Sequence, residues 1–205
     1  MKHKKPIIEN NIQNQYFRNF TVVITGDTLV GKTDIVNRLL GKGYKGVIEV
    51  GEYSEKRIID TKTDGELLIS YNKCPSGESY VKYNENLYKY GEGFIIVFDI
   101  TDKNTFDSID KYVNLIKEKS EKFSLIALIG NKIDLMNKMK INDDEMFQKS
   151  QEIKKLFPDK KVIFRTISAK SGDGIEELEI DIIEEAKKKL KREKEEREYQ
   201  GFEVI

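Results

Sequence analysis

The sequence has one cysteine, one histidine, three prolines and no tryptophan among its 205 residues. A single cysteine, Cys74, can neither form an internal disulfide nor supply a zinc cluster, so a reducing intracellular location is the default expectation. The only histidine, His3, lies in a polar amino-terminal segment. Catalysis by a Ser-His-Asp or Cys-His arrangement is therefore excluded, because no other imidazole is present.

An excess of one charge and long hydrophobic runs are also missing. Lysine plus arginine and aspartate plus glutamate number 36 each, so no overall field favours nucleic acid or an anionic membrane. No apolar run approaches the roughly 18 residues of a membrane-spanning helix. The composition, with 38 % hydrophobic residues, is that of an ordinary globular domain. Any anion-binding site must therefore be local.

Short apolar and β-branched runs alternate with helical patterns along the chain. Strands are predicted at residues 20–25, 56–61, 67–71, 93–100, 125–130 and 162–167. Helices are predicted at residues 32–40, 105–119, 143–157 and from 174 onward. This alternation predicts an α/β fold with a six-stranded, mostly parallel sheet, helices on both faces and one hairpin formed by residues 56–61 and the next strand. Such sheets bind ligands at the carboxyl ends of their strands.

The domain boundaries follow from where these patterns begin and end. Residues 1–19 are polar and predict a flexible arm, and residues 20–183 form the predicted domain. Of the 15 residues from 184 to 198, 13 are charged with mixed signs, which predicts a charged helical extension or linker over residues 184–205. The last five residues, Gly201-Phe202-Glu203-Val204-Ile205, echo the first predicted strand, as the start of a second domain would.

A glycine-rich octet follows the first predicted strand and begins the first predicted helix. It matches the pattern GxxxxGK[ST]. Glycine at both ends lets backbone N–H groups face inward as an anion nest, which the helix N-terminus continues. Lys32 would contact the β- and γ-phosphates, and the Thr33 hydroxyl would bind Mg²⁺. The phosphate site is thus predicted at Gly26, Asp27, Thr28, Leu29, Val30, Gly31, Lys32 and Thr33.

Two polar motifs follow the predicted strands at 125–130 and 162–167. They read Asn131-Lys132-Ile133-Asp134 and Ser168-Ala169-Lys170. The Asp134 carboxylate can accept hydrogen bonds from the N1–H and the exocyclic amine of guanine, a pair of donors that adenine lacks. The Lys132 stem can cover the base, and the Ala169 N–H can bond the guanine carbonyl oxygen. Either motif alone is also compatible with an ordinary polar loop. Together they predict a guanine site.

With these motifs the sequence resembles small GTPases of the Ras superfamily, and most of all the Rab branch. The likeness covers roughly residues 20–183, and residues 88–102 are similar to the Rab segment that runs into its fourth strand. It implies a P-loop G-domain that binds GTP or GDP with Mg²⁺, and it leaves open both a single G-domain and the amino-terminal half of a tandem G-domain protein. It also implies nucleotide contacts from Asp34, Tyr44, Asn131, Lys132, Asp134, Leu135, Ser168, Ala169 and Lys170.

Tyr44 carries the weakest of these implied contacts. It follows Gly26 by 18 residues, where the family usually has the aromatic that packs edge-on against guanine. The alternative is an ordinary half-buried loop aromatic.

The resemblance fails first at the family's switch threonine, which provides a second hydroxyl to Mg²⁺. Counting from Tyr44 gives Gly51, or Glu52 with one inserted residue. Ser54 or Thr61 could fill the role through a longer loop, because loops tolerate insertion.

It fails again in the DxxG segment, which reads Cys74-Pro75-Ser76-Gly77. A neutral thiol replaces the carboxylate that holds Mg²⁺ through water. The residue after Gly77, usually a glutamine that orients the attacking water, is Glu78, and a carboxylate there repels the γ-phosphate. Lost water positioning alone is worth on the order of 10²-fold in rate. We expect weak Mg²⁺ binding and very slow hydrolysis, with Lys32, Gly77 and a degenerate Glu78 as catalytic residues.

Two functions stay open at this point. One is a Rab-like switch with impaired GTP hydrolysis, acting in vesicle traffic by analogy with the family. The other is a scaffold that holds a guanine nucleotide without switching, and Asp134 argues against an ATP-dependent kinase. No cysteine follows Cys74, so the family's prenyl anchor has no acceptor in this chain. We expect a cytoplasmic protein, peripheral to membranes through partners, that binds effector or regulator proteins but no nucleic acid.

Overall fold

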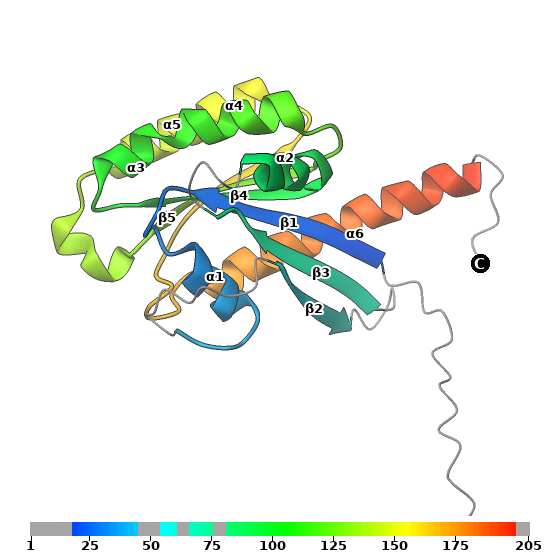
Figure 1. Cartoon of the computed structure of the whole chain (residues 1–205), viewed down its shortest axis with the longest axis horizontal. Helices are drawn as coiled ribbons and strands as arrows, with labels where there is room; N and C mark the ends of the chain where they lie inside the picture. Colours follow the sequence, from blue (N-terminus) through cyan, green and yellow to red (C-terminus); the bar gives the residue numbers. More distant parts are fainter. Residues whose placement is uncertain (1–17, 45–53, 61–65, 76–80, 200–205) are drawn as a thin grey trace, which may run out of the picture.

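The computed structural model describes residues 18–44, 54–60, 66–75 and 81–199. Within these ranges lies a six-stranded sheet in the order β2-β3-β1-β4-β5-β6 (Figure 1). The strands are β1 (Arg18–Gly26), β2 (Ser54–Asp60), β3 (Glu66–Lys73), β4 (Gly93–Asp99), β5 (Leu125–Asn131) and β6 (Lys161–Ile167). Neighbouring strands are parallel, except that β2 pairs with β3 in antiparallel fashion. The predicted α/β fold and its single hairpin are confirmed.

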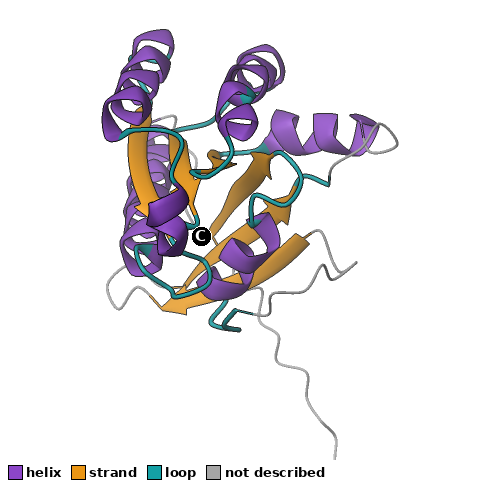
Figure 2. Cartoon of the chain, turned by 90° about the vertical axis from the view of Figure 1, so that its left-hand side faces the viewer, coloured by secondary structure: helices purple, strands orange, loops and turns teal. Residues whose placement is uncertain are grey.

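Helices cover both faces of the sheet (Figures 1 and 2). One face carries α1 (Lys32–Leu39) and α6 (Ile175–Tyr199), and the other carries α2 (Val81–Tyr90), α3 (Lys103–Asp107), α4 (Ile109–Lys119) and α5 (Asp143–Leu156). A short 3₁₀ helix, η2 (Ile133–Lys138), follows β5. None of the helices in the described ranges has the length and apolar character needed to cross a membrane.

The central strands are buried on both faces, which explains their nearly continuous apolar runs. Val22 and Ile24 of β1 point to the core under α1 and α6, whereas Val23 between them points to the core under α2, α4 and α5. In β4, Ile95 and Phe94 divide between the two cores in the same way. The alternation follows from the two-residue period of a strand.

The helix predicted at residues 105–119 is two helices in the structure. The first begins at Lys103 because the Asp102 side chain accepts a hydrogen bond from the Asn104 N–H at 3.1 Å and caps it. Ser108 separates α3 from α4. The residue pattern did not predict this break, because the buried residues of the two helices continue one helical stripe.

Helix α2 lies where the sequence predicts none. Its residues include tyrosines and asparagines, which favour helices only weakly. Tertiary contacts hold it: the Tyr88 ring stacks on Phe94 with centroids 5.6 Å apart, and the Tyr88 hydroxyl lies 2.6 Å from the Thr25 hydroxyl. Packing therefore overrides weak local propensity here.

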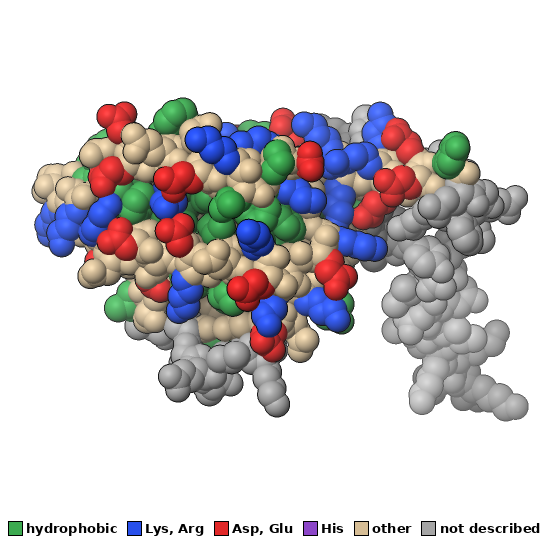
Figure 3. All heavy atoms as spheres, turned by 90° about the horizontal axis from the view of Figure 1, so that it is seen from above, with side chains coloured by type: hydrophobic (Ala, Val, Ile, Leu, Met, Phe, Trp, Pro, Cys, Tyr) green, Lys and Arg blue, Asp and Glu red, His purple; other side chains and the backbone are tan. Residues whose placement is uncertain are grey.

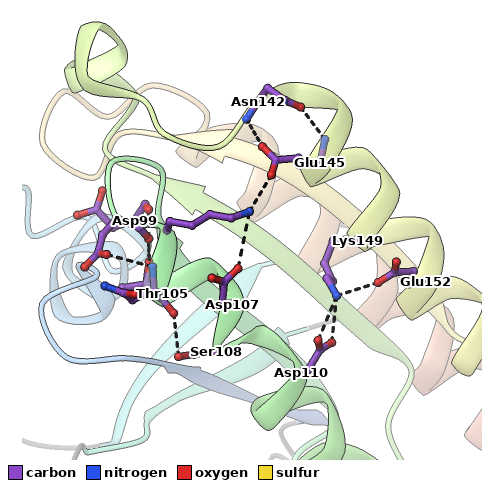
Figure 4. Close-up of polar contacts among 12 residues, drawn as sticks. Asp99, Thr105, Asp107, Ser108, Asp110, Asn142, Glu145, Lys149 and Glu152 are labelled. Carbon is purple, nitrogen blue, oxygen red and sulfur yellow. Dashed lines mark hydrogen bonds and ion pairs between the residues drawn. The ribbon is translucent and has the colours of Figure 1, made fainter.

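Ion pairs fasten α3 and α4 to α5 (Figure 4). Lys149 of α5 lies 3.2 Å from the Asp110 carboxylate of α4, and Lys103 of α3 lies 2.7 Å from Glu145. Glu145 also completes a capping box with Asn142 at the start of α5. Acidic and basic side chains are interspersed over this face of the molecule, in keeping with the zero net charge (Figure 3).

Helix α6 packs further along its length than the charge pattern predicts. Ala186 is fully buried and Leu190 packs against the core beneath the sheet, beyond the expected limit at Ile183. Lys189 donates a 2.6 Å hydrogen bond to Glu92, which precedes β4. The four-residue spacing of the apolar positions keeps the same stripe on the sheet through the charged stretch.

Candidate nucleotide-binding site

The loop from β1 to α1 folds tightly against the neighbouring strands. Gly26 and Gly31 have φ angles of 137° and 97°, in the region that favours glycine. A β-carbon at Gly26 would collide with the Val97 carbonyl oxygen, and one at Gly31 would collide with the Asn131 amide. Helix α1 begins at the next residue, so its first N–H groups continue the loop.

Lys32 lies within this loop. Its ammonium group donates to the carbonyl oxygens of Gly26 at 2.8 Å and Asp27 at 2.6 Å. Burial lowers the pKa of Lys32 to about 8, although the nearby Cys74 and Asp27 act in the opposite direction. A buried ammonium held by carbonyl groups is suited to bind an anion, because a nearby anion stabilises its charged form.

Asn131 joins three loops at the carboxyl edge of the sheet. Its side-chain amide donates to the Val30 carbonyl of the phosphate loop at 2.8 Å, and its oxygen accepts from the Ala169 N–H at 3.0 Å. Arg38 of α1 also holds the loop of residues 168–170. It donates hydrogen bonds to the carbonyl oxygens of Ala169, at 2.8 Å, and of Lys170. The two predicted motifs and the phosphate loop thus form one connected cluster, and the buried Asn131 side chain links its parts by hydrogen bonds.

Asp134 lies beside the second motif. The Ser168 hydroxyl donates to its carboxylate at 2.7 Å, and the Lys170 ammonium lies 3.8 Å from its other oxygen. Ser168 in turn accepts a hydrogen bond from the Ser171 N–H at 3.0 Å, which orients the hydroxyl. Leu135 lies in η2, with its N–H bonded to the Lys132 carbonyl at 2.8 Å. The structure therefore brings Asp134 and residues 168–170 together, as the sequence predicts.

The Ala169 N–H differs from the expectation in one respect. We expected it to be available to a guanine carbonyl oxygen, but in the structure it donates to Asn131. A guanine bound there would share or replace that hydrogen bond.

Other predicted residues lie around this cluster or outside the described ranges. Asp34 is in the first turn of α1, and Thr28 and Leu29 are exposed in the phosphate loop. Tyr44 is 45 % exposed at the end of a described segment, and its contact with a base remains a prediction. The predictions for Gly51, Glu52, Thr61, Ser76, Gly77 and Glu78 fall outside the described residues.

Ser54 begins β2, where it pairs with Asn72 of β3. The edge position of β2 leaves β3 between it and β1. The alternative that Ser54 provides the second hydroxyl therefore requires it to leave this pairing.

A polar cluster lies beneath the phosphate loop, and sequence patterns gave no signal for it. The Tyr112 hydroxyl of α4 donates to the Asp27 carboxylate at 2.6 Å. Cys74 is buried at the end of β3, where its N–H donates to the Ile24 carbonyl at 2.8 Å. Burial raises the pKa of the Cys74 thiol to about 12, so the group is neutral at physiological pH.

These donors can be compared with the needs of Mg²⁺, a hard cation that prefers several oxygen ligands. Thr33, in the first turn of α1, offers one hydroxyl oxygen of this kind. A protonated, buried Cys74 thiol offers neither oxygen nor charge. Over the part of the chain that the structure describes, no three His, Cys, Asp or Glu side chains form a metal-binding group. Of these two residues, Thr33 thus offers Mg²⁺ an oxygen atom and Cys74 does not.

Comparison with known proteins agrees with the fold and the loop geometry, which together define a P-loop nucleotide-binding domain. The model of the Ras family matches residues 21–188, and the chain belongs to this family. It is similar to the Ras-related protein RABA3 of Arabidopsis thaliana, with 28 % identity over 188 residues that cover 90 % of this chain and 74 % of the relative.

Two further relatives carry related names. The GTP-binding protein YPT53 of Saccharomyces cerevisiae is 29 % identical over 77 % of this chain and 71 % of its own length. The Ras-related protein RabF1 of Dictyostelium discoideum is 28 % identical over 84 % of this chain and 86 % of its own length. The predicted resemblance to Rab-like small GTPases of the Ras superfamily is confirmed, and this family binds GTP and GDP, generally with Mg²⁺.

Proposed function

We propose that the chain is a Rab-like small GTPase that binds guanine nucleotides through the cluster around Asn131, with impaired GTP hydrolysis and weak Mg²⁺ binding. The observation that carries the proposal is the pair of hydrogen bonds made by the Asn131 side chain. They tie the phosphate loop to the loop of residues 168–170, so a diphosphate and a purine can be gripped by one connected structure.

Guanine selectivity is assigned to Asp134. Its carboxylate is oriented by Ser168 and neighboured by Lys170, which keeps it in place for two donors on one edge of a base. Each carboxylate oxygen accepts more than one hydrogen bond, so the bond from Ser168 leaves capacity for guanine. Adenine would leave the carboxylate without matching donors, which is costly in a partly buried site.

We assign slow hydrolysis to the loss of the acidic group that the family has at the position of Cys74. The family position that holds Mg²⁺ through water is the neutral thiol of Cys74, and burial raises the pKa of this thiol to about 12, so it carries no charge for a metal ion. With a weaker metal clamp, less of the charge that develops during phosphoryl transfer is neutralised. Glu78 adds repulsion in the proposed mechanism, because an ionised carboxylate cannot donate a hydrogen bond to water.

A second candidate function is a scaffold that binds a guanine nucleotide without switching. The same buried Cys74 favours it, because a site with few metal contacts senses the γ-phosphate weakly. In that case the GTP- and GDP-bound forms would present nearly the same surface to partners.

Nucleotide release with and without EDTA, followed by single-turnover hydrolysis, separates the two candidates. A switch releases GDP faster in EDTA and liberates phosphate slowly, whereas a scaffold releases GDP at the same rate with and without EDTA and liberates no phosphate.

The variant Cys74→Asp should increase the effect of EDTA on GDP release at least about fivefold, since a carboxylate can hold Mg²⁺ through water. Cys74→Ser is the matched control and should behave like the natural chain. An equal response of both variants would contradict the role assigned to this position.

The proposed cellular role is in vesicle traffic, by analogy with Rab proteins, and the proposed location is the cytoplasm and membrane surfaces reached through partners. Effector or regulator proteins and a second G-domain in the same polypeptide are the proposed partners. Separation of cell lysates into cytosolic and membrane fractions tests the location. Recovery only from a compartment outside the cytoplasm would contradict it.

A further inference from the structure

Asp99 lies at the carboxyl end of β4, outside every predicted binding motif, and is 8 % exposed. One carboxylate oxygen accepts hydrogen bonds from the Thr101 N–H and hydroxyl, both at 2.8 Å. The other lies 2.6 Å from the Lys132 ammonium. Figure 4 shows Asp99 beside Thr105, whose hydroxyl oxygen accepts the Asp99 N–H at 3.0 Å. The residue is therefore fixed through both its backbone and its side chain.

The sheet register explains why Asp99 meets Lys132. Asp99 pairs with Asn131 across the parallel strands β4 and β5, and Lys132 is the next residue along the chain. Strand β4 thus delivers a carboxylate to the edge of the sheet where Asn131 brackets the loops. No local sequence motif encodes this meeting, because the two residues are 33 positions apart.

Both ends of the Lys132 side chain are held. Its backbone adopts a left-handed conformation with a φ angle of 74°, and its ammonium is held by Asp99. Burial by itself would raise the pKa of Asp99, but hydrogen bonds from Lys132 and Thr101 outweigh it and lower that pKa. The carboxylate is therefore ionised, and the long lysine stem between two fixed ends has lost most of its rotational freedom.

We propose that Asp99 is a positioning residue for the guanine nucleotide, acting through Lys132. The ion pair fixes the path of the lysine stem so that its methylene groups lie ready against the face of the base, and this slows nucleotide release. The proposal rests on the proposed function, in which the base lies between residues 131–134 and 168–170.

The variant Asp99→Asn keeps the size of the side chain and removes the charge that holds Lys132. We expect the dissociation rate of a fluorescent GDP analogue to rise about tenfold, since a hydrogen bond between charged groups is lost. Unchanged dissociation would overturn the proposal.

Asp181 provides the matched control. Its carboxylate lies on α6 and binds two cations, Arg165 at 2.6 Å and Lys161 at 3.1 Å. Its side chain is 13 % exposed, compared with 11 % for Asp99. Asp181→Asn should lower the unfolding temperature while the GDP dissociation rate stays within about twofold of the natural chain. If both variants accelerate release equally, the effect of Asp99 is a general loss of stability, and the proposal is overturned.

A double-variant cycle tests whether Asp99 acts through Lys132. Lys132→Met keeps an apolar stem but removes the ammonium, so Asp99→Asn should add no further acceleration in that background. Multiplicative effects of the two changes on the dissociation rate would show that Asp99 acts independently and would overturn the proposal.

If the natural chain itself fails to bind GDP, the proposed function fails. If it binds GDP but the cycle is multiplicative, only the role of Asp99 fails.

Discussion

The backbone conformation of Leu29 fits its side chain poorly. It adopts a left-handed conformation with a φ angle of 65° in the phosphate loop, and its side chain is 67 % exposed. A non-glycine residue in this region is strained by about 1–2 kcal/mol, and little burial of the side chain offsets that strain.

Replacing Leu29 with glycine should therefore raise the free energy of unfolding by about 1 kcal/mol, less the small entropy loss of glycine. Chemical denaturation of the nucleotide-free chain measures it. Leu156, the last residue of α5 and 50 % exposed, is the control. Leu156→Gly should lower the free energy of unfolding by up to about 1 kcal/mol, because glycine disfavours helix. A loss of stability in both variants would contradict the strain at Leu29.

Lys32 makes stability depend on pH in the nucleotide-free chain. Burial lowers its pKa from the ordinary value of 10.5 to about 8 in the folded state, so between these values the unfolded chain binds more protons. The Lys32 contribution to the free energy of unfolding must rise with pH from about 8 toward 10.5. The opposite trend sets in near pH 9 from Cys74 and above about pH 10 from Tyr88 and Tyr112, because burial raises the pKa of all three groups.

Denaturation curves between pH 7.5 and about 9.5 test this. The free energy of unfolding of Lys32→Met should rise less with pH over that window than that of the natural chain, because the opposing trend of Cys74 is present in both proteins. Parallel pH curves for the two proteins would contradict the buried position of Lys32.

At the scale of elements, strands were predictable and connections were less so. Strands β1, β4 and β5 are buried on both faces and contain short runs of apolar residues, a pattern typical of the inner strands of a parallel sheet. Helix α2 could not be predicted, because its stability comes from contacts such as Tyr88 with Phe94 rather than from helix propensity. The packing of α6 past residue 183 follows the apolar stripe that includes Ala186 and Leu190, which the three-and-four spacing of the sequence predicts, although the charged residues around it suggested an earlier domain boundary.

Glu92 holds α6 against the start of the sheet. Its carboxylate accepts hydrogen bonds from the Thr21 N–H at 2.7 Å and from Lys189 at 2.6 Å. Glu92→Gln should lower the free energy of unfolding by about 1–2 kcal/mol, measured by denaturant titration, because a partly buried charged pair is lost. Glu193, 3.7 Å from the same lysine and more exposed, is the control. Glu193→Gln should change stability by less than about 0.5 kcal/mol, and an equal loss in both would contradict the anchoring role of Glu92.

At the scale of the whole molecule, the candidate site is assembled at one edge of the sheet from the ends of β1, β4, β5 and β6. The phosphate loop and the motifs at Asn131 and Ser168 were predictable because each is a continuous stretch of sequence after its own strand. The contacts that Asp99, Tyr112 and Arg38 make were not predictable. Each joins two residues far apart in the sequence: Asp99 and Lys132 are separated by 33 positions, Tyr112 and Asp27 by 85, and Arg38 and Ala169 by more than 130. Such pairs are set by strand order and helix placement, which local patterns do not encode.

The central claim is that one site binds a guanine nucleotide and that Asp134 selects the base. Calorimetric titration of the natural chain and of Asp134→Asn with GDP, XDP and ADP tests it most directly. The natural chain should prefer GDP over XDP and ADP by at least about tenfold, and the variant should prefer XDP, because an amide matches the hydrogen-bonding edge of xanthine. Unchanged GDP affinity in the variant, or tighter binding of ADP by the natural chain, would contradict the claim.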